Sequence, residues 1–251
     1  MASFTLFRSE AREDKIHPSI LSTIRSMWWI YVSFTIIGIV LLSIVGMPVW
    51  DSINHAMCAI STGGFAVHSK SIGAYNNIYL EIIITLLTIF GATAFIANHN
   101  LFKGRFRKFL SDVQLRTLIA LIILGVLSMA LINLSFYQGN IWESMRHSFF
   151  QFASSQTTTG FSTINFSSWP TASKLIMSFA MIIGGAAGAT CGGVKLIRFL
   201  TLIKEIKWNA LKVISTPHRV IPYKMGDKPI SAEEKNNIVN EAVIISFILK
   251  E

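Results

Sequence analysis

Two stretches decide the fold: WDSINHAMCAISTGGF from Trp50 to Phe65, and WESMRHSFFQFASSQTTTGF from Trp142 to Phe161. Each opens with tryptophan, an acid and serine, carries a histidine five residues after the tryptophan, and ends in Gly-Phe. Long apolar segments flank both copies. Irregular backbone at membrane depth is tolerated only where it is buried in protein or lines a watery path. The repeat therefore predicts a pore or permeation pathway.

The composition places the chain in a membrane. Hydrophobic residues make up 52% and charged residues 14% of the sequence, with a mean hydropathy of +0.53, whereas a soluble domain has about 25% charged residues. A spanning helix needs about 20 apolar residues. Four charge-free windows are long enough, at Ser26–Trp50, Ile82–Phe102, Thr117–Trp142 and Leu175–Val194. We expect an all-α, polytopic membrane protein with four full spans.

The net charge of the chain is +9, and its basic residues are distributed by predicted side of the membrane. Basic residues gather before the first span, between the second and third, and after the fourth, while the other two connections hold only Lys70, Arg146 and Lys174. By the positive-inside rule the amino terminus is cytoplasmic in a cell (plasma) membrane, and both repeated loops face outward. This distribution favours membrane lipid over nucleic acid as a partner.

The repeat predicts two units of helix, re-entrant short helix with pore loop, and helix. The short helices are expected from Pro48 to about Ile60 and from Ile141 to about Gln156; the second is longer by four residues, roughly one turn. The expected segments are a cytoplasmic amino-terminal segment at 1–25, a first pore-loop unit at 26–102, a basic cytoplasmic loop at 103–116, a second unit at 117–203, a basic connector at 204–237 and the truncated start of a further unit at 238–251.

The glycine-bearing loops suit a monovalent cation. A dehydrated cation needs oxygens in place of its water shell, and backbone carbonyls supply them without a buried fixed charge. Glycine permits the positive φ values that turn successive carbonyls to one side. Neither loop holds an acid. The predicted ion filter, which would bind potassium, comprises Ser61, Thr62, Gly63, Gly64, Thr157, Thr158, Thr159 and Gly160. Phe65 and Phe161 are expected to pack behind the loops; the alternative is a pair of ordinary outward turns.

The short helices carry matched polar residues before the loops. Asp51 and Glu143 lie in the first turns, where we expect them to satisfy amino-terminal amides. His55 and His147 are interpreted as packing residues rather than metal ligands, since only these two unclustered histidines are available. No cofactor is expected in this chain.

A third feature, GGAAGATCGGVK at 184–195, interrupts the last apolar window. Each glycine costs a helix about 1 kcal/mol relative to alanine. Close helix packing through small residues is one explanation. We favour the other, a helix that unwinds into a movable plug beneath the loops. The predicted gate residues are Gly184, Gly185, Gly188, Gly192, Gly193 and Lys195.

These motifs together resemble the Trk/Ktr/HKT superfamily of potassium transporters. The resemblance rests on STGGF at 61–65, TTTGFST at 157–163 with the following Trp169-Pro170, and the 184–195 segment. The resemblance covers nearly the whole chain. Of the four pore-loop units of the family, this sequence resembles only the second and third, plus the start of the fourth. It implies that Gly64 and Gly160 are filter glycines and that 184–193 is an intramembrane gating loop. It also implies homodimers and a cytoplasmic nucleotide-binding regulatory subunit.

The sequence thus predicts uptake of a monovalent cation, potassium or alternatively sodium. Two of four units do not close a pore, so other chains would supply the rest. The alternative is a nonconducting truncated fragment or assembly subunit. A secondary carrier would need polar residues within the spans, and only Asn98, His99 and Asn133 lie near span ends. No catalytic constellation is visible, so an enzyme is not expected.

Overall fold

The computed structural model describes residues 20–214, 224–225 and 228–229. The chain divides into two compact units, Met1–Gly193 and Val194–Glu251, and each is described by itself. The further unit expected at 238–251 lies outside the described residues, as do most of the amino-terminal segment expected at 1–25 and much of the connector expected at 204–237.

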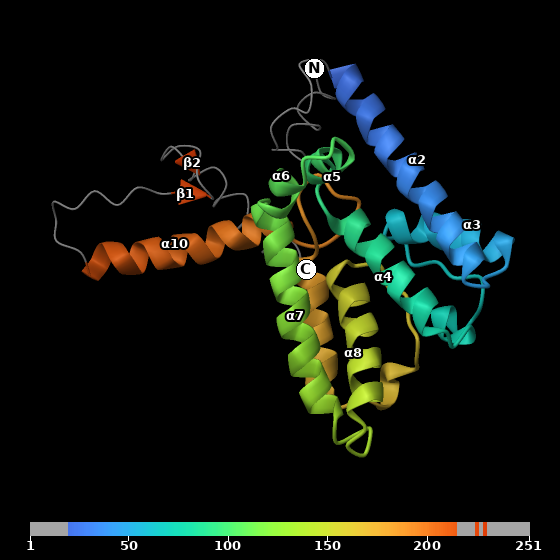
Figure 1. Ribbon diagram of the computed structural model, residues 1–251. Helices are drawn as coiled ribbons and strands as arrows, with labels where there is room; N and C mark the ends of the chain where they lie inside the picture. The colour runs from blue at the N-terminus through green and yellow to red at the C-terminus, as the bar shows by residue number, and fades with distance from the viewer. Residues whose placement is uncertain (1–19, 215–223, 226–227, 230–251) are drawn as a thin grey trace, which may run out of the picture. The chain divides into compact units, whose positions relative to one another are not determined.

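The first unit is built from helices (Figure 1). In chain order they are α2 (Ile20–Ile44), α3 (Val49–Ile60), the 3₁₀ helix η1 (Ser71–Ala74), α4 (Ile78–Ala92), α5 (Phe95–Phe102), α6 (Phe106–Leu110), α7 (Val113–Asn133), α8 (Ile141–Gln156), the 3₁₀ helix η2 (Phe166–Ser168) and α9 (Thr171–Ile183). The second unit holds α10 (Leu196–Ile214) and an antiparallel pair, β1 (Lys224–Met225) with β2 (Lys228–Pro229). The predicted all-α class is confirmed.

Two groups of three helices follow one packing plan. Helices α2, α3 and α4 contact one another, α7, α8 and α9 do the same, and α4 contacts α8 across the two groups. Pro48 precedes α3, as its fixed φ suits a helix start. Asn140 precedes α8 and its side-chain oxygen accepts from the Glu143 amide at 3.3 Å. Both short helices have the predicted bounds.

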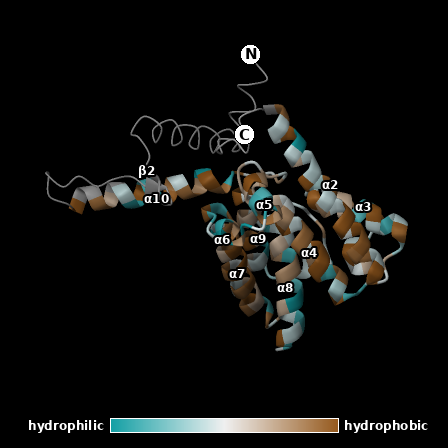
Figure 2. Cartoon of the chain, turned by 45° about the horizontal axis from the view of Figure 1, so that its top comes forward, coloured by the Kyte–Doolittle hydropathy of each residue, from teal (hydrophilic) through white to brown (hydrophobic). Residues whose placement is uncertain are grey.

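The core joins the two groups. Fully buried side chains from the first group, among them Leu42, Ala56 and Ile84, form one cluster with Phe150 and Phe161 from the second group. Much of the helical sequence is hydrophobic, as the brown ribbons of Figure 2 show. Apolar side chains exposed on α2, α7 and α9 include Ile36, Leu41, Ile44, Ile123, Leu124, Leu131, Leu175, Phe179 and Ile182. Apolar exposure on this scale is typical of a surface covered by lipid.

Within the residues that the structure describes, the four predicted full spans are not observed. Leu21–Ile44 and Val113–Asn133 are long and apolar enough to cross a membrane, but the window predicted at Ile82–Phe102 is split into α4 and α5, which meet at 113°. Thr93 at the corner has extended backbone, with φ −89° and ψ 143°. The Phe90 carbonyl accepts from the Thr93 amide at 3.2 Å and from the Asn98 side-chain amide at 3.0 Å, and the second bond ties α5 to the end of α4.

The fourth predicted span is also interrupted. Helix α9 has 13 residues and ends at Ile183, because Gly184 adopts φ 64° and ψ −156°, a conformation that glycine alone adopts readily. The chain then runs without helix until Leu196, where α10 begins in the second unit. Helix α10 continues to Ile214 and so crosses the boundary expected at residue 203. The glycine-rich segment therefore divides this window rather than lying within a continuous helix.

Candidate functional site

The first loop follows directly on the carboxyl end of α3. Ser61 is still nearly helical, with φ −78° and ψ −3°, and the Gly63 amide donates to the Cys58 carbonyl at 2.8 Å. Thr62 and Gly64 have positive φ, at 51° and 68°. The loop thus alternates residues of negative and positive φ, which lets neighbouring carbonyl oxygens turn to the same side.

The second loop repeats this backbone at the end of α8. Thr157 has φ −81° and ψ 0°, and the Thr159 amide donates to the Ser154 carbonyl at 2.9 Å. Positive φ recurs at Thr158 and Gly160, at 54° and 91°. The pattern matches position by position, although the second loop has threonine where the first has Gly63. Positive φ is rare for β-branched residues, so its occurrence at two matched threonines is a shared structural feature.

The carbonyl oxygens of these loops are available to a ligand. Within the described residues, no hydrogen bond is donated to the carbonyls of residues 62–64 or 157–160. Neither loop holds an acid, and both follow directly on helix carboxyl ends, whose partial negative charge favours a cation. Such an oxygen set can replace the water shell of an alkali cation.

The two loops are in backbone contact. A Cβ atom added at Gly64 would lie 1.8 Å from the Thr159 carbonyl oxygen, whereas one added at Gly160 would meet nothing within 4 Å. Gly64 therefore sits against the other loop, and Gly160 borders open space. The eight residues predicted as an ion filter are brought together by the first unit.

The two phenylalanines behave differently. Phe161 is 1% exposed, and its ring lies 5.8 Å from the His55 ring. Its carbonyl accepts a hydrogen bond from the Ser154 hydroxyl at 2.8 Å, which turns the chain back toward the core. Phe65 is 78% exposed, so the prediction that it packs behind its loop is wrong.

The glycine-rich segment lies against the second loop and the end of α8. The Gly192 amide donates to the Thr158 hydroxyl at 2.8 Å, and the Gln156 side chain donates to the Gly184 carbonyl at 2.7 Å. Gly184, Gly188 and Gly193 have positive φ. The predicted gate glycines at 184, 185, 188, 192 and 193 all belong to the first unit, whereas Lys195 lies in the second unit.

The segment also completes the corner between α4 and α5. The Ala186 amide donates to the Ala92 carbonyl at 2.9 Å, and the Phe95 amide donates to the Gly188 carbonyl at 3.1 Å. The Gln114 side chain accepts from the Ala187 amide at 2.8 Å. Gln114 and Gln156 were not singled out in the sequence, since glutamine in an apolar helix gives no spacing signal.

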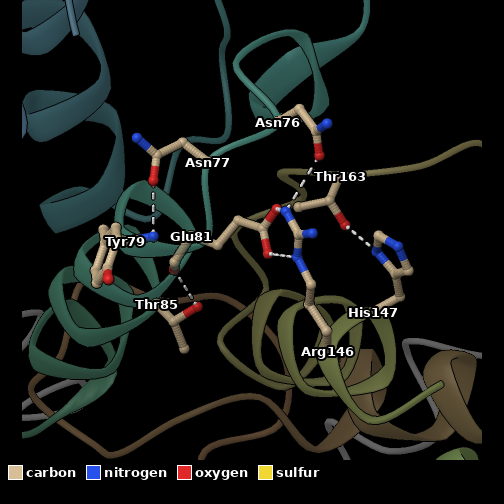
Figure 3. Close-up of polar contacts among 8 residues, drawn as sticks. All are labelled: Asn76, Asn77, Tyr79, Glu81, Thr85, Arg146, His147 and Thr163. Carbon is tan, nitrogen blue, oxygen red and sulfur yellow. Dashed lines mark hydrogen bonds and ion pairs between the residues drawn. The ribbon is translucent and has the colours of Figure 1, made fainter. Parts of the chain in front are cut away.

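A charged pair joins the two helix groups (Figure 3). Arg146 of α8 donates to both carboxylate oxygens of Glu81 on α4, at 2.6 and 2.9 Å, and to the Asn76 side chain at 3.3 Å. The side chains are 19% and 5% exposed. Sequence reasoning missed this pair, but Arg146 was one of three basic residues on the predicted outer side. A charge in an apolar setting requires a partner.

The acids at the starts of the short helices do not cap them. The Asp51 carboxylate accepts from Tyr75 at 2.5 Å and contacts His68 at 3.3 Å. The hydrogen bond from Tyr75 lowers the pKa of Asp51, and burial together with the same bond raises the pKa of Tyr75. Both groups therefore keep this bond at neutral pH, and it ties α3 to the chain after η1. The α8 amides use Asn140, not Glu143.

The two histidines make local contacts. The His55 Nδ1 atom lies 2.7 Å from the Asp51 carbonyl oxygen, and the His147 Nδ1 atom lies 3.2 Å from the Thr163 hydroxyl, as Figure 3 shows. Among the residues that the structure describes, no three His, Cys, Asp or Glu side chains form a metal site.

Comparisons with known proteins agree on one family. Residues 2–248 match the TrkH family, described as cation transport proteins. The chain is 34% identical over 248 residues to an uncharacterized cation transporter of Methanocaldococcus jannaschii, covering 98% of this chain and 48% of that protein. It is 32% identical over 233 residues to the Trk system potassium uptake protein TrkG of Escherichia coli, covering 90% and 47%.

A solved structure shares the fold. The crystal structure of the potassium transporter TrkH from Vibrio parahaemolyticus superposes with a TM-score of 0.86 at 25% identity, covering 98% of this chain and 53% of that one. The chain spans about half the length of the relatives that it matches. It belongs to the TrkH family of cation transport proteins, a family of membrane transporters rather than enzymes.

Proposed function

We propose that this chain takes part in potassium uptake across the cell membrane and contributes two filter segments, Ser61–Gly64 and Thr157–Gly160. The observation that carries the proposal is the matched backbone of the two loops. Each has positive φ at its second and fourth residue, and the two loops touch at Gly64 and Thr159.

Potassium is the proposed ion for two reasons. The loops offer carbonyl dipoles and hydroxyls without a fixed charge, which suits a monovalent cation. The relative from Escherichia coli is named a potassium uptake protein. Sodium is the other alkali cation that such oxygens can take, and competition between the two ions in a flux assay decides between them.

The remaining pore oxygens have to come from outside the described residues. Two segments cannot surround an ion, and the chain covers 48% of the first relative's length. We place the missing segments on a longer form of the protein or on a pairing chain, and we propose a dimeric assembly with a cytoplasmic nucleotide-binding regulatory subunit. In this arrangement the amino terminus is cytoplasmic, the loops open outward, and 184–193 acts as the gate.

The test is rubidium or potassium uptake by a bacterium that lacks its own potassium uptake systems and expresses this chain. Gly160→Asp is expected to reduce uptake at least tenfold, because its carboxylate would extend into the open space beside the filter and hold the cation there. Gly139→Asp is the matched control. Gly139 has φ 84° and Gly160 has φ 91°, and a Cβ at either meets nothing within 4 Å.

Equal uptake by the parent and Gly160→Asp would remove the filter assignment. Absence of uptake by the parent chain would instead favour the nonconducting fragment or assembly subunit. Co-expression with a chain carrying further pore-loop units then separates those cases, since a pairing chain would restore uptake and a nonfunctional fragment would not.

A further inference from the structure

Side-chain hydrogen bonds hold the 184–193 segment against the second filter loop and the end of α3. The Thr158 hydroxyl accepts from the Gly192 amide at 2.8 Å. The Thr190 hydroxyl lies 2.8 Å from the Ile60 carbonyl, at the end of α3, and 3.0 Å from the Gly91 carbonyl. The segment is thus bonded to the second loop and to the helix that carries the first.

Thr158 differs from the other filter threonines. The hydroxyls of Thr157 and Thr159 bond each other at 2.8 Å, and the Thr62 hydroxyl donates to the Ser61 carbonyl at 2.8 Å. Those bonds stay within one loop. Among the filter residues the structure describes, the Thr158 hydroxyl is bonded to the glycine-rich segment instead.

The backbone of Thr158 gives this bond a further effect. A non-glycine residue at φ 54° is strained and persists only where its surroundings hold it there. Thr62 has the same conformation but is held by its own loop. The Thr158 amide donates to the Ser155 carbonyl at 3.0 Å within its own loop, but its side-chain bond comes from the segment. A displaced segment would leave this strained residue with its backbone contact alone.

The segment fits closely against itself and its neighbours. A Cβ added at Gly184 would lie 2.2 Å from the Gly192 carbonyl oxygen, and one added at Gly193 would lie 2.8 Å from the Met181 carbonyl oxygen. Glycine at these positions lets the segment pack this closely. Its displacement would break the side-chain bonds of Thr158 and Thr190.

We propose that Thr158 is a positioning residue that couples the 184–193 segment to the geometry of the filter, with Thr190 as a second attachment. This inference rests on the proposed function of the loops. While the segment is seated, Thr158 keeps its filter conformation and the segment stays beneath the loops. When the segment leaves, the second loop loses the bond that holds Thr158 at positive φ.

The labelling rate of the native Cys191 thiol reports whether the 184–193 segment is in place. It is buried, at 3% exposed, and adjoins Gly192. The chain has two cysteines, so replacing Cys58 with alanine leaves Cys191 as the single target. The experiment measures the rate at which a cationic methanethiosulfonate labels Cys191 in opened membrane vesicles containing the full chain, with membrane insertion checked for each variant.

Thr158→Val removes the hydroxyl but keeps the branched shape, and it is expected to raise the labelling rate about three- to tenfold, the range that one lost hydrogen bond gives. Thr190→Val is expected to act in the same direction. Thr158→Ser retains the hydroxyl and should stay near the parent rate. Thr157→Val is the matched control, because it alters the neighbouring filter threonine without touching the segment.

Equal labelling of the parent and Thr158→Val would overturn the coupling, as would an equal rise in Thr157→Val. The assay needs no ion flux, so it separates the two proposals. Expected labelling rates without uptake, even on co-expression with a chain carrying further pore-loop units, contradict the transport function, whereas uptake with unchanged labelling contradicts the role of Thr158.

Discussion

Gly64→Ala is expected to abolish ion uptake and to lower the stability of the folded chain. The added methyl carbon would lie 1.8 Å from the Thr159 carbonyl oxygen, so the two loops would have to separate. Alanine at φ 68° adds a left-handed penalty of about 1–2 kcal/mol. Uptake of rubidium, and the temperature at which the detergent-solubilised chain loses its monodisperse peak, measure the two effects.

Gly46→Ala isolates the conformational part of that effect. Gly46 has φ 99°, and a Cβ there meets nothing within 4 Å. Its substitution should cost the conformational penalty alone and leave the loops in contact. If Gly64→Ala conducts as well as Gly46→Ala, the backbone contact between the loops is not needed for transport.

Separating the Glu81–Arg146 pair is expected to produce the largest loss of stability. The two side chains are joined by two hydrogen bonds at 2.6 and 2.9 Å and are largely buried. Removing one partner of a buried pair costs about 3–5 kcal/mol, because the other charge remains without compensation. Glu81→Gln and Arg146→Met should each reduce thermal stability strongly, as read by the same monodispersity assay.

The double variant distinguishes a paired charge from two independent contacts. Combining Glu81→Gln with Arg146→Met should destabilise the chain by clearly less than the sum of the single changes, since no unpaired charge is left. Glu143→Gln is the matched control. Glu143 is exposed on the same helix as Arg146, and its substitution should change the free energy of unfolding by about 0.5 kcal/mol or less. Strict additivity would contradict the pairing.

The sequence predicted the local elements more fully than their contacts. The bounds of α3 and α8 followed from Pro48, from the polar turn before Ile141 and from the Ser/Thr-Gly breaks, all of which act within a few residues. The family followed from the same motifs. The corner at Thr93 could not be predicted in this way, because the surrounding residues are apolar and no proline marks the break.

The missed features depend on contacts between distant residues. The corner at Thr93 is completed by amides of the 184–193 segment, about ninety residues later in the chain. The exposure of Phe65 depends on where its loop leaves the core, although Phe161 in the matched position is buried. The partner of Arg146 lies 65 residues away on another helix. Periodicity and composition carry no information on such pairings.

The corner between α4 and α5 has a mechanical consequence. At this corner the backbone groups of Gly91, Ala92 and Phe95 form hydrogen bonds with the 184–193 segment. The corner therefore cannot straighten, and the segment cannot move away, while these bonds remain. The bend is therefore not an independent hinge. Any event that lifts the segment also unlocks the bend, and the two behave as a single cooperative opening unit.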